Sequence, residues 1–571
     1  MSRHSWTVPG PGMASTFRAM PQAPPSTLLS NVLLPTADGK YARKDVLMSD
    51  GKIAKIGEAK TLGETGIDCS ERILLPGFVN AHTHSIEHWA RGLIKPLPLE
   101  LWVQQLIRHE PRGDEGWQGE ESFVKTPAES VGISAIHCGV EALLSGCTAI
   151  LDHLWVRHLD DLDAAVKAYK ALGIRAFIAP MLGDDAVLHS NYIPLANDAE
   201  GRNHAAACKK LCCGAMGKDG AFRTANSPRD PEKTKEVLAL WEEAVKKFHD
   251  PAGGIEIVIG PVTAYSASAE LLQGAAALRR KYDLCGHTHL LETRAQALMA
   301  RQWLPSGSAV KHLHDTGFLQ GRGTSCAHTV WLDDEEIALM AKDGATAVHN
   351  PLSNVRLGSG VMPVKRFVDA GVNVAMGCDG SCSSDGQDML EALKLATFLP
   401  CIRTAEYRDW PAPRHTALML AAKNGYKAVG MEGAAGELAE GMAADVTLWD
   451  LTSLALLPRT DPISLLVIGS RTQAPGAGSS LHSCWIRGRQ VVADGEPCGV
   501  DLRALRSLMM GCQTEYRDPE ITDPRGHPST SMNEVEYRAA MGLDIEGQAT
   551  PTSEALGIYP QQRVLYDSTI P

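Results

Sequence analysis

The sequence lacks two features that would point to a membrane or to a nucleic acid. No apolar run approaches the roughly 18–20 residues that a membrane-spanning helix requires, so no membrane partner is expected. Basic residues are also outnumbered: the chain has 55 Lys and Arg residues and 67 Asp and Glu residues, which gives a net charge of −12 at pH 7. Nucleic-acid binding needs a basic face, so this balance argues against a nucleic-acid partner.

A dense cysteine framework and a secretory signal are missing too. The 14 cysteines are scattered along 571 residues, whereas secreted disulfide scaffolds are short and rich in cysteine. The cluster of Cys208, Cys212 and Cys213 has poor spacing for zinc, which favours ordinary thiols. Residues 1–26 contain no apolar core segment, although their basic, acid-free composition leaves an organelle-targeting segment as an alternative to a disordered leader. We therefore expect reduced thiols and a cytoplasmic location.

Short apolar runs alternate with helix-like segments through the middle of the chain. The eight runs are residues 77–84, 148–153, 175–182, 255–262, 284–290, 324–330, 346–351 and 373–379. Continuous apolar runs are typical of parallel strands that are buried on both faces. Helical patterns intervene, for example at 231–248 and 334–344. Eight strands with helical returns predict an α/β fold, a (β/α)8 TIM barrel, over residues 76–430.

The segments that flank this barrel have a different pattern. Residues 27–75 and 431–499 consist of short β-like runs with turn signals, and Asp50-Gly51 is a hairpin signal. We expect both flanks to form one small β-sandwich domain. Residues 1–26 are predicted to be a disordered leader, and residues 500–571 an extended or partly disordered C-terminal extension. The insertion at 184–230 is predicted to be a lid or disordered, because loops of that length are uncommon in compact domains.

The ends of the predicted strands carry the residues that could bind a metal ion or transfer protons. The first strand ends in His82-Thr83-His84, and residues two apart in a strand face the same side, so both imidazoles can bind one metal ion. The fifth strand ends in His287-Thr288-His289, one of which could be a third ligand. Glu292 follows just beyond that strand, where a carboxylate can transfer a proton without being a ligand.

Two further strand ends complete this constellation. The sixth strand ends at His328 and the eighth at Asp379. In a closed barrel the eighth strand lies beside the first, which places Asp379 next to His82 and His84. Three imidazoles and a carboxylate, without thiolate, suit zinc or ferrous iron with an open position for water. The fourth strand, IVIGPVTAY, offers no Lys as a bridging ligand, so a single metal ion is predicted.

These residues resemble the amidohydrolase superfamily, in particular its branch of cytosine, guanine and adenosine-type deaminases and triazine hydrolases. The resemblance spans about residues 27–497. The matching stretches are PGFVNAHTHS (76–85), SGCTAILDH (145–153), HTHLLET (287–293), CAHTVWL (326–332), HNPLSNVRLGSGVMPV (349–364), VAMGCDGSCSSDGQDM (374–389) and GELAEGMAADVTLWD (436–450).

The resemblance implies a role for each strand-end residue. One divalent metal ion, Zn²⁺ or alternatively Fe²⁺, would be held by His82, His84, His289 and Asp379. Glu292, His328 and Asp379 would be the catalytic residues that handle protons. The expected reaction is hydrolytic deamination of a small amino-substituted N-heterocycle of the purine, pyrimidine, pterin or triazine type. The family precedent implies a homodimer.

Other readings of the same site stay open. A hydrolase could displace chloride or an alkylamine from a ring, or cleave an amide or urea C–N bond. A non-catalytic scaffold should have lost its ligands, and all of them are present. Many nucleoside deaminases of this branch have a Pro-His pair after the fourth strand, but here Val262 follows Pro261. Val262 cannot hydrogen-bond a substrate through its side chain, which puts an adenosine-like substrate in doubt.

Substrate contacts are expected in the loop and helix after the first strand, and at the end of the seventh strand. Trp102 and Gln105 are the candidates in the former region, and His349 is the candidate in the latter. Further residues that could line the site are Glu100, Gln104, Glu110, Asp152 and His153.

Overall fold

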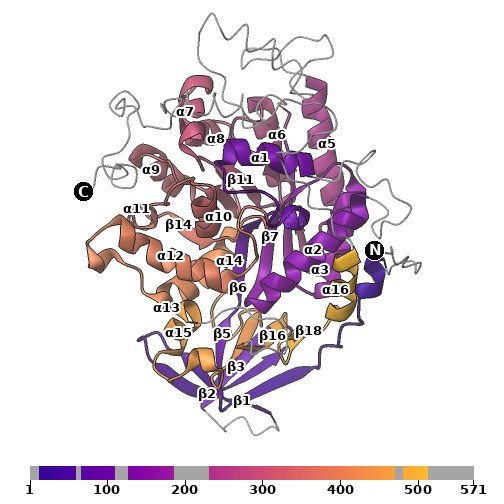
Figure 1. Cartoon of the computed structure of the whole chain (residues 1–571), viewed down its shortest axis with the longest axis vertical. Helices are drawn as coiled ribbons and strands as arrows, with labels where there is room; N and C mark the ends of the chain where they lie inside the picture. The colour runs from indigo at the N-terminus through magenta and orange to yellow at the C-terminus, as the bar shows by residue number, and fades with distance from the viewer. Residues whose placement is uncertain (1–11, 59–65, 110–126, 185–230, 470–479, 512–571) are drawn as a thin grey trace, which may run out of the picture.

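The computed structural model describes residues 12–58, 66–109, 127–184, 231–469 and 480–511. Strands from both flanks of the chain lie at the lower end of the molecule in Figure 1. The strands and helices of the middle of the chain lie above them, so the two flanking segments meet although about 370 residues of sequence separate β5 (Arg72–Pro76) from β15 (Val446–Asp450).

Every predicted strand of the middle region is present. They are β6 (Phe78–Thr83), β7 (Cys147–Trp155), β8 (Arg175–Leu182), β9 (Ile255–Ile257), β10 (Gly260–Pro261), β11 (Gly286–Leu290), β12 (Thr324–His328), β13 (Thr346–His349) and β14 (Asn373–Met376). The fourth predicted strand is split into β9 and β10. Between these two pieces Val258 N–H donates to Ile178 on β8, and Ile259 N–H donates to Cys285, just before β11.

These strands form two parallel sheets in the described residues, with orders β10-β8-β7-β6, where β9 also pairs with β8, and β11-β12-β13-β14. Parallel bridges join Ile259 to Gly286 and Thr263 to His289, and thereby connect the two sheets. At the other end, the Asp379 N–H donates to the His82 carbonyl at 2.9 Å. The segment after β14 therefore lies beside the end of β6, as the sequence predicts.

Helices follow the strands. Those of the middle region are α1 (Leu99–His109), α2 (Pro127–Leu144), α3 (Leu159–Leu172), α5 (Pro231–Phe248), α6 (Ala269–Tyr282), α7 (Arg294–Trp303), α8 (Ala309–Asp315), α9 (Asp334–Asp343), α10 (Pro351–Arg356), α11 (Val364–Asp369), α12 (Met389–Arg403), α13 (Pro413–His415) and α14 (Asn424–Ala428). A short 3-10 helix, η2 (Ser85–Ala90), directly follows β6, and a π-helix, η5 (Thr416–Lys423), precedes α14.

The helices predicted at 231–248 and 334–344 are confirmed as α5 and α9. Local sequence sets both ends of α9: the Asp333 side chain accepts the Glu336 N–H, and Gly344 ends the helix at φ 71°. Among the described helices, none combines the length and the apolar character that crossing a bilayer would require.

The flanking strands form one hydrogen-bonded sheet. Its strands are β1 (Ser26–Pro35), β2 (Tyr41–Ser49), β3 (Lys52–Glu58), β4 (Ile67–Asp68), β5, β15, β16 (Leu481–Ile486), β17 (Arg489–Ala493) and β18 (Glu496–Pro497). The hairpin at Asp50-Gly51 is present, and both residues have positive φ, at 50° and 74°. Because β5 pairs with β1 on one side and β15 on the other, the described strands make a single continuous sheet, which does not confirm a sandwich of two.

Parts of both terminal segments are ordered where their composition predicts disorder. Residues Met13–Thr16 form a 3-10 helix, and Leu502–Gly511 form helix α16. The Arg18 N–H donates to the Gly499 carbonyl at 2.9 Å, and the Arg18 side chain pairs with Asp501. The two termini thus order each other by tertiary contact, which local composition does not register. Residues 1–11 of the predicted leader, 512–571 of the predicted extension and 185–230 of the insertion lie outside the described residues.

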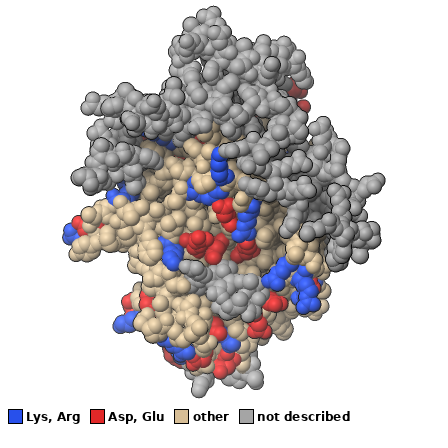
Figure 2. All heavy atoms as spheres, in the orientation of Figure 1, with Lys and Arg blue, Asp and Glu red and all other residues tan. Residues whose placement is uncertain are grey.

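Charges of both signs share the visible surface. On the face drawn in Figure 2, the described Lys and Arg side chains are interspersed with Asp and Glu, and they form no continuous basic surface there. This distribution agrees with the net negative charge of the chain and gives no support for a nucleic-acid partner.

Candidate active site

Four predicted metal ligands converge where the strands end. His82 lies at the end of β6, His84 immediately follows that strand, His289 lies on β11, and Asp379 comes after β14. The Asp379 Oδ1 atom is 3.2 Å from His82 Nε2 and 3.5 Å from His84 Nε2. The Nε2 atoms of His84 and His289 are 3.1 Å apart. His82, His84 and Asp379 are buried, and His289 is partly exposed.

The other ring nitrogens explain which atoms face inward. His84 Nδ1 donates to the His153 carbonyl at 2.6 Å, and His289 Nδ1 donates to the Val262 carbonyl at 2.8 Å. With the proton on Nδ1, each Nε2 presents a lone pair. His82 Nε2 is buried and makes no hydrogen bond. Facing lone pairs repel each other unless a cation lies between them, so this donor set fits a metal ion.

The protonation states also fit a metal site. Burial lowers the pKa of His82 well below its usual value and that of His289 to about 3, so both imidazoles are neutral at neutral pH. Burial alone would raise the pKa of Asp379, but the His82 ring 3.2 Å away, with His328 and His84 nearby, holds that pKa well below the ordinary range. Neutral imidazoles and an ionised carboxylate are the ligating forms of these residues.

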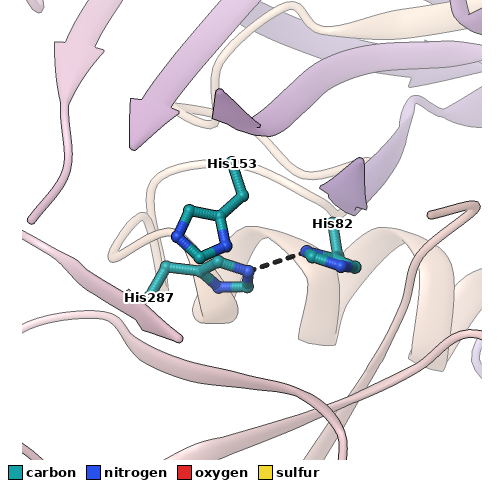
Figure 3. Close-up of side chains that lie close together, drawn as sticks. All are labelled: His82, His153 and His287. Atoms are coloured by element: carbon teal, nitrogen blue, oxygen red, sulfur yellow. Dashed lines mark hydrogen bonds between the residues drawn. The ribbon is translucent and has the colours of Figure 1, made fainter. Parts of the chain in front are cut away.

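His153 and His287 lie beside the predicted ligand His82 (Figure 3). His287 Nε2 is 2.8 Å from His82 Nδ1, and His287 Nδ1 is 2.8 Å from Ser325 Oγ. The His153 ring lies edge-on to His287, with 5.0 Å between ring centroids. The sequence left His287 as an alternative ligand; in the structure it is His289 that faces His84, and His287 contacts the outer nitrogen of His82. His287 and His289 are two residues apart, as are His82 and His84, and this spacing is the sequence signal that the four rings share one side of the strands.

The predicted proton-transfer residues lie beside the ligands. Glu292 Oε2 is 3.5 Å from His328 Nε2, which in turn is 3.8 Å from Asp379 Oδ2. Ser359 Oγ donates to the other Glu292 oxygen at 3.0 Å. Burial and the nearby charge of Asp379 raise the pKa of Glu292 well above its usual value. The environment therefore favours the protonated form of Glu292, next to a neutral imidazole.

His328 is held in one orientation by an asparagine. Its Nδ1 is 3.0 Å from Asn354 Oδ1, and burial lowers the pKa of the ring. Since Nδ1 donates to Asn354, the Nε2 atom is left as an acceptor that faces Glu292 and Asp379. A buried acceptor between an acid and a carboxylate can orient a water molecule or exchange a proton.

Several of these strand ends have strained backbone. His328 has φ 73° and Asp379 has φ 63°, and Leu291, next to Glu292, has φ 47°. Residues other than glycine seldom adopt positive φ, and such strain persists only where surrounding contacts enforce it. The strain turns each chain segment sharply as it leaves its strand, at the positions that carry the polar side chains.

The residues predicted to contact the substrate lie on two different elements, α1 and β13. Trp102 and Gln105 are buried on α1, and Trp102 Nε1 has no hydrogen-bond partner among the described residues. His349 is buried at the end of β13, and its Nδ1 also lacks a partner. Glu100 accepts a hydrogen bond from Thr293. The side chain of Gln104, and residues Glu110, Cys208, Cys212 and Cys213, lie outside the described residues.

Two residues near the site were given little or no role by the sequence. Tyr265 is buried with its hydroxyl unpartnered, and the charges of Glu292 and Glu100 raise its pKa further after burial has raised it. Asp152, at the end of β7, accepts the Ser85 N–H at 3.0 Å and thereby fixes the turn after His84. A buried, unpaired hydroxyl beside two carboxyl groups has no signature in the sequence, because only folding brings the three together.

Comparisons with known proteins agree with the geometry. The family model described as the amidohydrolase family matches residues 73–477. A 5'-deoxyadenosine deaminase of Methanosarcina mazei is 29% identical over 471 residues, 82% of this chain and 93% of the relative. A 5-methylthioadenosine/S-adenosylhomocysteine deaminase of Thermococcus kodakarensis is 31% identical over 429 residues, 74% of this chain and 85% of the relative.

A solved structure supports the fold. The zinc complex of an atrazine chlorohydrolase from Arthrobacter aurescens TC1 superposes with a TM-score of 0.68, at 22% identity, over 85% of this chain and 100% of that chain. At this identity the likeness concerns the fold alone. The family model covers most of the chain and includes every strand end described above. This chain therefore belongs to the amidohydrolase family.

Proposed function

We propose that this chain is a metal-dependent aminohydrolase that releases ammonia from an amino-substituted N-heterocycle. The observation that carries the proposal is the position of Glu292, a buried acid with a raised pKa, 3.5 Å from His328 and beside the convergent imidazoles. An amino group leaves a ring more readily when a neighbouring ring nitrogen is protonated, and a neutral carboxylic acid can supply that proton. The relatives named as deaminases support the same reaction class.

The proposed ligands are His82, His84, His289 and Asp379. The convergence of their donor atoms, and the Nδ1 hydrogen bonds that turn Nε2 of His84 and His289 inward, support this assignment. Zn²⁺ is the proposed ion, since neutral imidazole with one carboxylate suits it, and Fe²⁺ is the alternative. When bound, such an ion supplies Lewis acidity and lowers the pKa of water from about 15.7 to about 7.

The remaining steps belong to residues of the chain. Asp379, ionised because its pKa is low, accepts the proton of the attacking water. His328 Nε2, the acceptor between Glu292 and Asp379, orients that water. Glu292 donates its proton to a ring nitrogen, which makes the adjacent carbon electrophilic, and the leaving amine takes up a proton and departs as ammonia. General acid–base transfer of this kind contributes typically about 10²–10⁴-fold to the rate.

The fold proposed for this chemistry is a closed (β/α)8 barrel of residues 76–430. The bridges between β10 and β11 and the hydrogen bond from Asp379 to His82 support closure at both junctions of the two sheets. The division into a leader, a β domain of both flanks, a barrel and an extension stays a prediction. So does the homodimer, which the mass of the native protein in solution tests.

The substrate is proposed only at the level of its class. Adenosine derivatives are named for the relatives, whereas the Val262 side chain offers no hydrogen bond and its carbonyl is occupied by His289. The test is ammonia release from a panel of adenosine derivatives, guanine, pterins and aminotriazines by the metal-loaded protein. Glu336→Gln is the matched control for Glu292→Gln, because Glu336 is a partly buried glutamate that also has a raised pKa, but it caps α9.

Ammonia release that is lost in Glu292→Gln and retained in Glu336→Gln supports the proposal. If no member of the panel releases ammonia while chlorinated rings, N-alkylated rings or ureas are consumed, the deaminase assignment is wrong and the alternative hydrolase is correct.

A further inference from the structure

Outside the proposed active site, three side chains with metal-binding atoms converge between η2 and α2. His88 comes from η2, and His137 and Glu141 lie four residues apart on one face of α2. One potential ligand atom from each residue lies within 4.8 Å of the other two. The Nε2 atoms of His88 and His137 are 3.5 and 3.6 Å from the Glu141 carboxylate.

These distances suit a bound ion better than they suit direct hydrogen bonds. Donor–acceptor distances beyond about 3.2 Å are long for an N–H···O bond. Ligands that surround Zn²⁺ tetrahedrally at about 2.0–2.1 Å are themselves about 3.3–3.5 Å apart. The two contacts to the Glu141 carboxylate are close to that spacing. An ion of this size could therefore be bound with small movements of the side chains.

The His88 ring turns one nitrogen toward the carboxylate. Its Nδ1 is 3.3 Å from the Ser85 carbonyl, and its Nε2 lies 3.1 Å from Ser381 Oγ and 3.5 Å from the Glu141 carboxylate. His137 Nδ1 is buried without a hydrogen-bond partner. Two imidazole nitrogens thus meet at one carboxylate, which also accepts the Gln387 N–H at 3.1 Å and pairs with a nearby cation.

Arg91 is that cation. Its Nη1 donates to Glu141 Oε1 at 2.6 Å, and about a third of its side chain is exposed, so it can move away into solvent. Burial and the charge of His88 lower the pKa of His137 to about 3, so His137 is neutral at neutral pH. Burial opposes ionisation of Glu141, but its contact with His88 lowers its pKa below the usual range. A divalent ion would find His137 neutral and Glu141 ionised, and Arg91 is the positive charge that it would have to displace.

We propose that His88, His137 and Glu141 form a second metal site, selective for Zn²⁺ and similar transition-metal ions, for which Arg91 is the competing cation. Two imidazoles and one carboxylate leave a fourth position for water. Imidazole donors disfavour Mg²⁺, which prefers oxygen ligands. The site lies between two elements, so a bound ion would tie η2 to α2 and raise the melting temperature of the protein.

The test is a Zn²⁺ titration of the full-length protein already loaded at the proposed active site. We expect wild type to bind one more ion per chain than His137→Gln, measured by equilibrium dialysis with metal analysis. His314→Gln is the matched control, because His314 also pairs with a carboxylate, Asp343, and its side chain is 27% exposed against 28% for His137. It should bind as many ions as wild type. Mg²⁺ in place of Zn²⁺ should not bind.

Arg91→Ala separates a metal site from a merely structural cluster. Removal of the competing guanidinium should tighten the second Zn²⁺ site at least threefold, whereas a structural role alone predicts no gain in affinity. If Arg91→Ala does not fold, the Zn²⁺-dependent rise in melting temperature of wild type, absent in His137→Gln, tests the same claim. Equal ion counts in wild type and His137→Gln, equal binding of Mg²⁺, or weaker binding in Arg91→Ala would overturn the proposal.

Discussion

Two buried polar clusters lie at different ends of the middle strands, and they differ in how completely they are paired. Near the start of β8, Arg175 pairs with Asp445, which also accepts the Arg487 N–H at 2.7 Å and the Tyr426 hydroxyl at 2.9 Å. At the opposite strand ends, the imidazoles of the proposed active site face one another, and His82 Nε2 and His349 Nδ1 have no hydrogen bond.

The difference indicates what each cluster is for. Buried polar groups are nearly always hydrogen-bonded, because an unpaired one costs about 1–3 kcal/mol. The Asp445 cluster meets this rule and joins the flanking sheet to the middle strands. The imidazole cluster breaks it at several atoms, and it does so where the backbone is also strained. A cluster in which every polar group is paired suits a structural role. A cluster with unpaired ring nitrogens suits the binding of a ligand.

The largest expected effect comes from removing a ligand of the unsatisfied cluster. Asp379→Asn removes the ionised carboxylate that faces His82 and His84, so we expect loss of the bound metal and activity at the background level. Because the imidazole cluster is not a structural anchor, the metal-free variant should unfold at the same denaturant concentration as metal-free wild type. Metal analysis and urea unfolding measure the two quantities. Normal metal content would mean that the ligand set is wrong.

Glu292→Gln should lower kcat by about 10²–10⁴-fold while the metal content stays normal. The amide is similar in size and can still accept from Ser359, but it cannot donate an acidic proton. Steady-state kinetics and metal analysis of the same sample provide the check, with Glu336→Gln as control. Metal loss in this variant would show that Glu292 is a ligand instead.

The pH profile should report the same carboxyl group. The pKa of Glu292 is raised, and the proposed mechanism needs its protonated form, so kcat/KM should be constant below that pKa and fall as the pH rises through it. The measurement is kcat/KM against pH for wild type and Glu292→Gln. A basic limb that is equally steep in the variant would exclude Glu292 as the acid.

Asp445→Asn should lower the stability of the protein and leave its metal content unchanged, the reverse of the effect expected for Asp379→Asn. It leaves Arg175, which is largely buried, without its counter-charge, and breaking such a pair costs about 3–5 kcal/mol of unfolding free energy. Urea unfolding should reveal this loss, while the metal content of the folded fraction stays at the wild-type level. Metal loss without a loss of stability would reverse the distinction between the two clusters.

His287→Gln tests the histidine next to His82 and should weaken metal binding less than Asp379→Asn does. His287 contacts His82 Nδ1 and is itself held by Ser325, so it fixes the tautomer and orientation of His82. Partners of this type change metal affinity about 10–100-fold. Competition with a chelator measures the affinity. An unchanged affinity would mean that the contact between the two rings is incidental.

Much of this arrangement could be predicted from the sequence. Apolar runs that alternate with helix-like segments predicted the strands. A parallel α/β fold places successive strand ends on one side, so the side chains at these ends could be expected to meet, namely His82, His84, His289, His328 and Asp379. The caps of α9 and the Asp50-Gly51 turn are local signals and were equally accessible.

Other features depend on contacts between distant residues and have no local signal. The order of Met13–Thr16 depends on Gly499 and Asp501, nearly 500 residues away. The continuity of the flanking sheet follows from β5 pairing with both β1 and β15. Tyr265 acquires an unpaired hydroxyl near Glu292 only after folding. Composition and periodicity describe one segment at a time and cannot register such pairings.

The most direct test of the central claim is ammonia release as a function of metal content. The protein is stripped with a chelator, reloaded with increasing Zn²⁺, and assayed with each heterocycle of the panel. The account predicts that ammonia release by at least one heterocycle disappears in the stripped protein and returns in proportion to the first equivalent of bound Zn²⁺, and that reloaded Asp379→Asn stays inactive. Ammonia release that persists in the stripped protein, or in Asp379→Asn, would contradict it.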